Sequence, residues 1–323
     1  MREALICVNF VCNLRCKVCA VWQQHNPASV PPGLYRRLPR GLRRVTLTGG
    51  EIFLDPALEE RVRVIAETCP RARVILITNG TLPDKVEDLV RRVRGDVPRV
   101  GVRVPLDGPR ELHDRLRGHE GAFDGAVETL RRLRALGLRD LGVSFTVQPE
   151  NLGAAPAVAA LADDLGVEFV CNVVQNSSLA YATRGNQIGV GRAAPELKWV
   201  IARQLRSPRW KDWFRAYFSE LLLRYHRTGD RPLPCTAGRA SFFLNYDGGV
   251  YACNMLDDRL GDIADDDVEA IFAKPEVRQR VDALETCQAC WTSCNVGEAL
   301  RRNPLRMLAW VVRRKIRGSR TPA

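Results

Sequence analysis

Short apolar runs alternate with amphipathic segments over the first half of the chain. Six runs are apolar at successive positions, as parallel strands covered on both faces require: Ala4–Val8, Arg44–Thr48, Val74–Thr78, Val100–Leu106, Gly142–Val147 and Glu168–Val173. Stretches with a helical period separate them: Pro56–Glu67, Asp84–Arg94, Phe123–Leu136 and Ala154–Leu165. This alternation predicts an α/β fold, either a doubly wound sheet or a partial α/β barrel, and periodicity alone does not separate the two.

The second half of the chain has a different pattern. Residues 176–194 are polar and Gly-rich, which predicts a loop or linker. Residues 195–227 are helical and rich in aromatic side chains, with a break at Ser207-Pro208. We expect these aromatic side chains to pack in the core against the barrel. The alternative is that they form a lid over a substrate. Beyond residue 232, Tyr246-Asp247-Gly248-Gly249 between two apolar runs predicts a β-hairpin.

These changes predict four parts along the chain. They are an α/β unit, a loop and aromatic-rich helical connector, a small cysteine-bearing domain, and a basic amphipathic helix or tail: residues 1–175, 176–230, 231–300 and 301–323. In the last part, apolar residues recur between arginines. We favour packing of this helix along the barrel, and contact with anionic lipid or an acidic partner is the alternative.

Composition and charge narrow the class of protein. The 323 residues are 46% hydrophobic and 27% charged, which is typical of a globular protein. No run approaches the roughly 20 apolar residues that cross a membrane, and the first residues lack the pattern of a secretory signal. We therefore expect a cytoplasmic protein. The net charge of +12 comes from arginines spread along the chain, so we expect no nucleic-acid partner.

Eight of the eleven cysteines fall into two groups: Cys12, Cys16 and Cys19, and then Cys235, Cys253, Cys287, Cys290 and Cys294. In a reducing compartment, grouped cysteines indicate metal binding or catalysis rather than disulfides. The first group follows the first predicted strand, at the end where α/β barrels build their active sites. Its three thiolates can hold three irons of a [4Fe–4S] cluster and leave the fourth iron open, whereas a structural zinc site needs a fourth protein ligand.

At these residues the sequence resembles the radical S-adenosylmethionine (SAM) enzymes, whose motif is a CxxxCxxC loop after the first barrel strand. Thr48-Gly49-Gly50-Glu51 resembles the GGE motif of the family, and Thr78-Asn79-Gly80 ends the third predicted strand. Val104–Pro109 with Leu112–Gly118 resembles the fourth-strand signature of the SPASM/Twitch branch. The resemblance implies a partial (β/α)6, TIM-like barrel followed by a small cluster-binding domain.

The resemblance also implies roles for individual residues. Cys12, Cys16 and Cys19 would hold a [4Fe–4S] cluster whose open iron binds SAM. The remaining contacts to SAM or substrate would come from Gly49, Gly50, Glu51, Thr78, Asn79, Asp107 and Arg117. Val18 stands where the family usually has an aromatic residue, so an apolar rather than stacked contact to adenine is implied.

The late cysteines resemble the auxiliary-cluster extension of the same family. A full SPASM domain has more cysteines, and the five present here suffice for one auxiliary [4Fe–4S] cluster, as in the shorter Twitch form. The expected ligands are Cys235, Cys253, Cys287 and Cys290, and Cys294 is either a replacement ligand or a spare thiol that donates hydrogen. A zinc ribbon built from the same thiols is the alternative.

The implied activity is reductive cleavage of SAM to a 5′-deoxyadenosyl radical, which abstracts hydrogen from a substrate. A flavodoxin- or ferredoxin-type protein would supply the electron. We expect oxidation, cross-linking or epimerisation of a peptide or natural-product precursor, with help from the auxiliary cluster. One alternative is dehydrogenation or epimerisation of a small sugar-like or aminoglycoside-type metabolite, and another is a non-catalytic zinc or electron-transfer protein.

Overall fold

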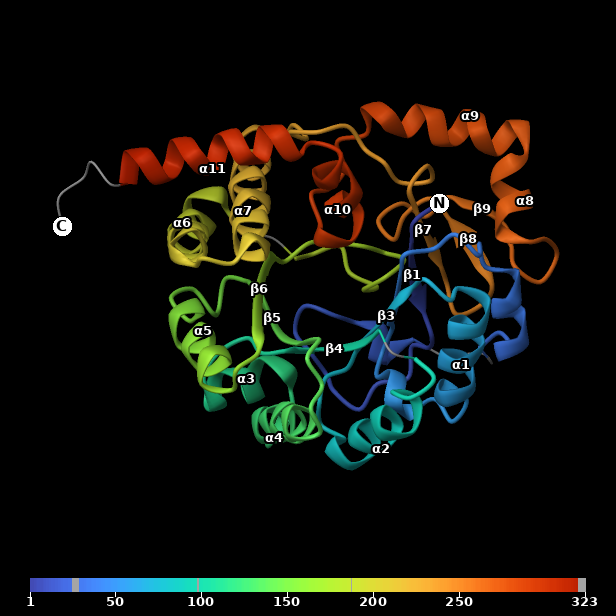
Figure 1. Ribbon diagram of the computed structural model, residues 1–323, viewed down its shortest axis with the longest axis horizontal. Helices are drawn as coiled ribbons and strands as arrows, with labels where there is room; N and C mark the ends of the chain where they lie inside the picture. Colours follow the sequence, from blue (N-terminus) through green and yellow to red (C-terminus); the bar gives the residue numbers. More distant parts are fainter. Residues whose placement is uncertain (25–28, 98, 187, 319–323) are drawn as a thin grey trace.

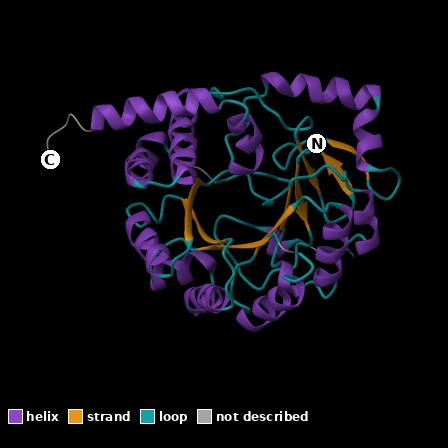
Figure 2. Ribbon diagram, in the orientation of Figure 1, coloured by secondary structure: helices purple, strands orange, loops and turns teal. Residues whose placement is uncertain are grey.

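The strands of the computed structural model form one curved sheet (Figures 1 and 2). The structure describes residues 1–24, 29–97, 99–186 and 188–318, without the side chains of Val190, Cys294 and Arg317. Within these ranges the sheet has nine strands, in the order β6-β5-β4-β3-β2-β1-β7-β8-β9. The first six are Glu3–Cys7 (β1), Arg44–Thr48 (β2), Arg73–Ile77 (β3), Val100–Pro105 (β4), Leu141–Val147 (β5) and Glu168–Val173 (β6).

The order of these six strands separates the two α/β architectures. All neighbours from β1 to β6 are parallel, and each strand lies beside the one that precedes it in the sequence. A doubly wound sheet reverses its strand order at a switch point, and this sheet does not. The predicted partial barrel is therefore confirmed, with strand ends that differ from the expected ones by at most one residue.

Helices cover the outer side of the curved sheet, as Figure 2 shows. They are Leu58–Thr68 (α1), Pro83–Val93 (α2), Arg110–Arg117 (α3), Ala122–Ala135 (α4) and Ala155–Asp164 (α5). Ile65, Val90 and Leu130 point inward from three of them and are fully buried. Helix α3 was not expected, because its short, highly charged sequence offers few apolar positions. It ends at Gly118, which adopts the left-handed conformation common after a helix.

The connector contains two long helices, Val190–Arg206 (α6) and Trp210–Thr228 (α7), separated at Ser207 as predicted. Helix α6 begins within the stretch that was expected to be a loop. Gly189 and Gly191 give this stretch a loop-like composition, but Ala193 and Leu197 are buried in the core and stabilise the helix. Tertiary packing thus outweighs local propensity here.

The predicted hairpin is present and continues the barrel sheet. Strands Ser241–Leu244 (β7), Gly249–Tyr251 (β8) and Arg259–Asp262 (β9) follow β1, with β7 parallel to β1 and the next two pairs antiparallel. The chain ends with Val268–Ala273 (α8), Pro275–Ala283 (α9), Ser293–Arg301 (α10) and Pro304–Gly318 (α11). Strand β1 therefore joins the barrel to the part that carries the late cysteines. No helix in the described ranges is long and apolar enough to cross a membrane.

Candidate active site

The loops that follow β1 to β4 meet at the carboxyl edge of the parallel sheet, where α/β barrels place their catalytic groups. The loop after β1 carries Cys12, Cys16 and Cys19, all half-buried. Burial raises the pKa of the Cys12 and Cys19 thiols to about 11. Metal ligands are thiolates, so bound iron would supply the positive charge that keeps these sulfurs deprotonated. The three thiols on one loop fit the predicted cluster.

Gly49 and Gly50 hold this cysteine loop through the backbone. The Gly50 N–H donates to the Asn9 carbonyl oxygen at 2.8 Å, and the Glu51 N–H donates to the Val11 carbonyl oxygen at 2.7 Å. A Cβ atom at either glycine would clash with one of these carbonyls. The family resemblance implies that these glycines contact SAM, and this contact stays a prediction. In the structure they bring the end of β2 against the segment that enters the cysteine loop.

The Glu51 carboxylate is fully buried and organises the end of β3. It accepts hydrogen bonds from the backbone N–H groups of Phe53 (3.0 Å) and Asn79 (2.7 Å) and from the Thr78 hydroxyl (2.9 Å). Burial outweighs these hydrogen bonds and raises the pKa of Glu51 from 4.5 to about 7. Glu51, Thr78 and Asn79, each predicted at the site, are thus brought together in a single hydrogen-bonded group.

We expect the pKa of Glu51 to produce a measurable pH dependence of stability. The folded state holds the proton more tightly than the unfolded chain, so the stabilisation is complete below about pH 4.5 and is lost as the pH rises to about 7. The loss is about 3 kcal/mol. Urea unfolding of the cluster-free protein and of Glu51→Gln, at several pH values, measures it. The free energy of unfolding of the wild type minus that of Glu51→Gln should fall by this amount between about pH 4.5 and about pH 7, and a difference that stays constant would contradict the assignment.

Arg117, at the end of α3, connects Asp107 to the cysteine loop. Its guanidinium forms a buried salt bridge with Asp107 (2.6 Å) and lies 3.7 Å from the Cys16 sulfur, to which it donates. The backbone N–H groups of Arg15 and Lys17 donate to the last carbonyls of α3. The family resemblance implies that Asp107 and Arg117 contact SAM or substrate, and these contacts stay predictions. The structure adds that Arg117 places a positive charge beside the sulfur of Cys16, one of the predicted ligands.

Two side-chain hydrogen bonds hold the cysteine loop from other sides, and they involve two asparagines that were not predicted at the site, Asn13 within the loop and Asn186 in the segment after β6. The Asn79 amide donates to the Asn13 side-chain oxygen at 2.8 Å. The Asn186 amide donates to the carbonyl oxygen of Val18 at 2.9 Å. Val18, predicted to contact adenine, is half-buried. Single asparagines carry no motif, so no local signal in the sequence identifies these contacts.

The second cysteine group comes together beside β7 and β8. Cys235 and Cys253 share a buried apolar cluster with Cys287 at its edge, and Cys290 is close enough to raise the pKa of the Cys253 thiol electrostatically, in addition to the larger effect of burial. The structure therefore brings the four predicted ligands together. The side chain of Cys294, in α10, lies outside the described part.

Hydrogen-bond donors surround the sulfurs of this group. Arg231 and Asn295 donate to the Cys290 sulfur at 3.6 and 3.7 Å, and the Ala289 N–H donates to the Cys287 sulfur at 3.5 Å. Donors and positive charge around thiolates are the surroundings that tune iron–sulfur clusters, so the residues fit the predicted auxiliary cluster. In the described ranges, no three His, Cys, Asp or Glu side chains gather as closely as a single bound metal ion needs.

The connector segment 175–186 forms hydrogen bonds with residues next to both cysteine groups. On the first side, the Ala20 N–H donates to the Tyr181 carbonyl oxygen at 2.9 Å. On the second, the Ser177 hydroxyl donates to the Asn254 carbonyl oxygen at 2.5 Å, next to Cys253, and the Gln175 amide donates to the Trp291 carbonyl oxygen at 3.1 Å. One short segment thus lies between the two groups of thiols.

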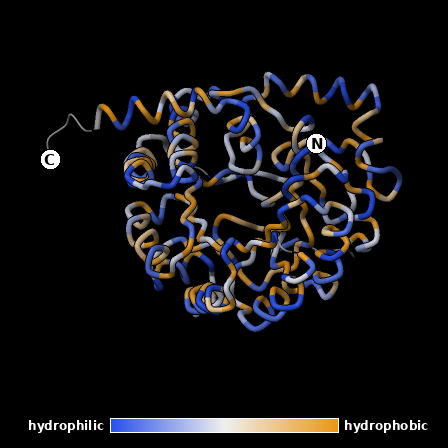
Figure 3. The backbone as a smooth tube through the Cα atoms, in the orientation of Figure 1, coloured by the Kyte–Doolittle hydropathy of each residue, from blue (hydrophilic) through white to orange (hydrophobic). Residues whose placement is uncertain are grey.

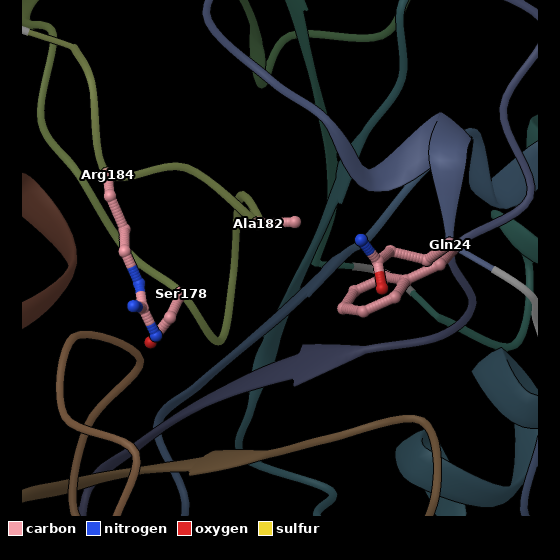
Figure 4. A pocket seen from close by; sticks show the side chains of 5 residues that line it. Gln24, Ser178, Ala182 and Arg184 are labelled. Atoms are coloured by element: carbon pink, nitrogen blue, oxygen red, sulfur yellow. The ribbon is translucent and has the colours of Figure 1, made fainter.

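A cavity of 390 Å³ opens between this segment and the cysteine loop (Figure 4). Figure 4 shows Gln24 on one side and Ser178, Ala182 and Arg184 on the other, and Phe10 also lines the cavity. Ala182 has a positive φ of 53°, which is unusual for a residue with a side chain and is typical of functional sites. The cavity offers one cation, two neutral polar groups and an aromatic ring to a bound molecule.

Comparison with known proteins agrees with this site. Residues 6–156 match the radical SAM superfamily, and residues 235–295 match SPASM, an iron–sulfur cluster-binding domain. The chain therefore belongs to the radical SAM superfamily, in the branch with a SPASM or Twitch domain. Members of this family are enzymes. The cofactors are SAM, the [4Fe–4S] cluster that binds it and an auxiliary [4Fe–4S] cluster.

This chain spans only part of the length of the curated relatives that it matches. Fe-coproporphyrin III synthase of Methanosarcina barkeri is 31% identical over 144 residues, 45% of this chain and 34% of the relative. The sporulation killing factor maturation protein SkfB of Bacillus subtilis is 25% identical over 257 residues, 77% of this chain and 57% of SkfB. The solved structure of Streptococcus suis SuiB bound to S-adenosylmethionine has the same fold, with a TM-score of 0.67 and 11% identity over 90% of this chain and 72% of that one.

Proposed function

We propose that the protein oxidises a peptide precursor of a natural product in the cytoplasm, using a flavodoxin- or ferredoxin-type reductant. The observation that carries the proposal is that the connector segment 175–186 forms hydrogen bonds with residues next to both cysteine groups. A substrate bound against this segment would lie between the predicted radical source and the predicted electron acceptor. The likeness to SkfB, named for maturation of a killing factor, supports a peptide as the substrate.

The clusters that the two cysteine groups would hold, together with SAM, would supply three things: one electron to start the reaction, abstraction of one hydrogen atom from a substrate C–H bond, and acceptance of one further electron, with one proton passing to solvent. The chain's own residues hold and orient the reactants. Arg117 and Asp107 fix the cysteine loop beside α3, and Glu51 fixes the end of β3. Arg184 and Gln24 line the cavity through which a peptide side chain would approach this loop.

A second candidate substrate is a tetrapyrrole. The likeness to Fe-coproporphyrin III synthase favours it, and Arg184 would pair with a carboxylate of such a substrate. The two candidates share the radical step and differ in the molecule that loses hydrogen.

Anaerobic reconstitution with iron and sulfide, followed by SAM and dithionite, tests the proposal. We expect 5′-deoxyadenosine, and with a precursor peptide encoded beside the gene we expect a product two hydrogens lighter. Deuterium moving from labelled peptide into 5′-deoxyadenosine would identify the hydrogen donor. Turnover of coproporphyrin alone would favour the second candidate, and no 5′-deoxyadenosine despite bound iron would refute the radical mechanism.

A further inference from the structure

Helix α11 has two apolar faces, and the protein covers one of them. Met307, Trp310 and Val311 pack toward α7, where the Trp310 ring lies 5.3 Å from the ring of Tyr217. The residues of the opposite face are between 46% and 79% exposed: Leu305, Leu308, Val312 and Ile316. Their spacing of three or four residues places them on one stripe along the helix. We call these four residues the α11 stripe.

Positive charge borders the α11 stripe. By helical position, Arg306 and Arg313 lie along one edge and Lys315 along the other. Arg306 and Arg313 are exposed and form no salt bridge with any residue that the structure describes. No Asp or Glu follows Glu298 in the sequence. A molecule that binds this face therefore contacts the aliphatic side chains of the α11 stripe and, beside them, positive charges that no acidic side chain of the described residues neutralises.

The helix lies at the periphery of the molecule. Figure 1 shows α11 running along an outer edge, with its end beyond α6 and α7, and Figure 3 shows apolar positions recurring between hydrophilic ones along it. A salt bridge of 2.6 Å from Arg314 to Glu220 and the packing of Trp310 hold the helix on α7. The α11 stripe is thus presented by a fixed helix and does not need to detach to be used.

The chemistry of this face favours a lipid surface over a protein. Energetic centres of protein interfaces are enriched in Trp and Tyr, but the α11 stripe is purely aliphatic and Trp310 faces inward. A second copy of the chain would set Arg306 and Arg313 against the same cations. A basic helix with an exposed aliphatic face instead matches the boundary between anionic headgroups and acyl chains.

We propose that α11 binds the surface of membranes that contain anionic lipid. The α11 stripe enters the boundary between headgroups and acyl chains, and Arg306 and Arg313 contact lipid phosphates. This is peripheral binding by one face of a helix. It would hold the enzyme at a membrane whatever its substrate, so it stands independently of the proposed function.

Sedimentation of the reconstituted holoenzyme with vesicles tests the proposal. We expect binding to phosphatidylcholine vesicles with about 30% phosphatidylglycerol, and binding that weakens as salt rises from about 0.1 M to about 0.5 M. Leu308→Asp should lower the partition constant at least about tenfold. Arg306→Gln with Arg313→Gln should lower it about thirtyfold.

A double variant elsewhere on the surface controls for net charge. Arg131→Gln with Arg278→Gln removes the same charge from two exposed positions on α4 and α9, and should bind anionic vesicles like the wild type. All variants should keep the wild-type iron content. Equal binding to pure phosphatidylcholine, or no binding to either vesicle, would overturn the proposal. Binding to poly-glutamate without vesicle binding, or a dimer that Leu308→Asp dissociates, would assign the face to a protein and overturn it too.

Discussion

Replacing Cys12, Cys16 and Cys19 together with alanine is expected to abolish formation of 5′-deoxyadenosine and to halve the bound iron. Two [4Fe–4S] clusters give about eight irons per chain, so about four should remain. The loss follows because these three thiols are the only cysteines on the loop after β1, and Cys16 lies beside the Arg117 cation. Iron and labile sulfide after anaerobic reconstitution, and chromatography of the SAM products, measure the two effects.

Cys69 and Cys171 provide a matched control. Both are buried thiols outside the two groups, and burial raises the pKa of each above the ordinary thiol value. Cys69→Ala with Cys171→Ala should keep about eight irons and full cleavage of SAM. If the triple variant kept about eight irons, the first group would not be a cluster site. If it lost all iron, the two sites would not form independently.

The sequence predicted the barrel because its signals are local. Each strand from β1 to β6 is a short apolar run, and each motif residue sits where such a run ends. Parallel strands bring those ends to one edge, so the gathering of the cysteine loop, Glu51, Asn79 and Asp107 follows from the strand pattern alone. The family resemblance then decided between two architectures that share the pattern.

Contacts between distant segments could not be predicted in the same way. The pairing of β7 with β1, and the bond from Asn186 to Val18, join residues separated by the whole barrel. Such contacts depend on how the chain closes in space, and the residue types involved are too common to mark them. The contacts of the two glycines after β2 could not be predicted from the sequence either. The sequence identified them as a motif, but only the structure shows that Gly49 and Gly50 pack on the cysteine-loop backbone.

Replacing Cys235 and Cys290 with alanine is expected to separate cleavage of SAM from oxidation of the substrate. The change removes two of the four gathered thiols, so bound iron should fall from about eight to about four per chain. The first group is untouched, and 5′-deoxyadenosine should still form. The substrate radical then has no electron acceptor across the connector segment 175–186, so we expect the oxidised product to fall at least about a hundredfold.

The structure also supplies a milder variant for this test. Asn295→Ala removes one hydrogen bond to the Cys290 sulfur and leaves all the ligands in place. It should retain about eight irons and lower the reduction potential of the auxiliary cluster, because a donor to sulfur favours the reduced, more negative cluster. Redox titration followed by electron paramagnetic resonance measures the shift.

Full product formation by the double cysteine variant at about four irons would show that the electron leaves the substrate by another route. Loss of 5′-deoxyadenosine in that variant, with circular dichroism unchanged, would show instead that the second group acts on the SAM site through the connector.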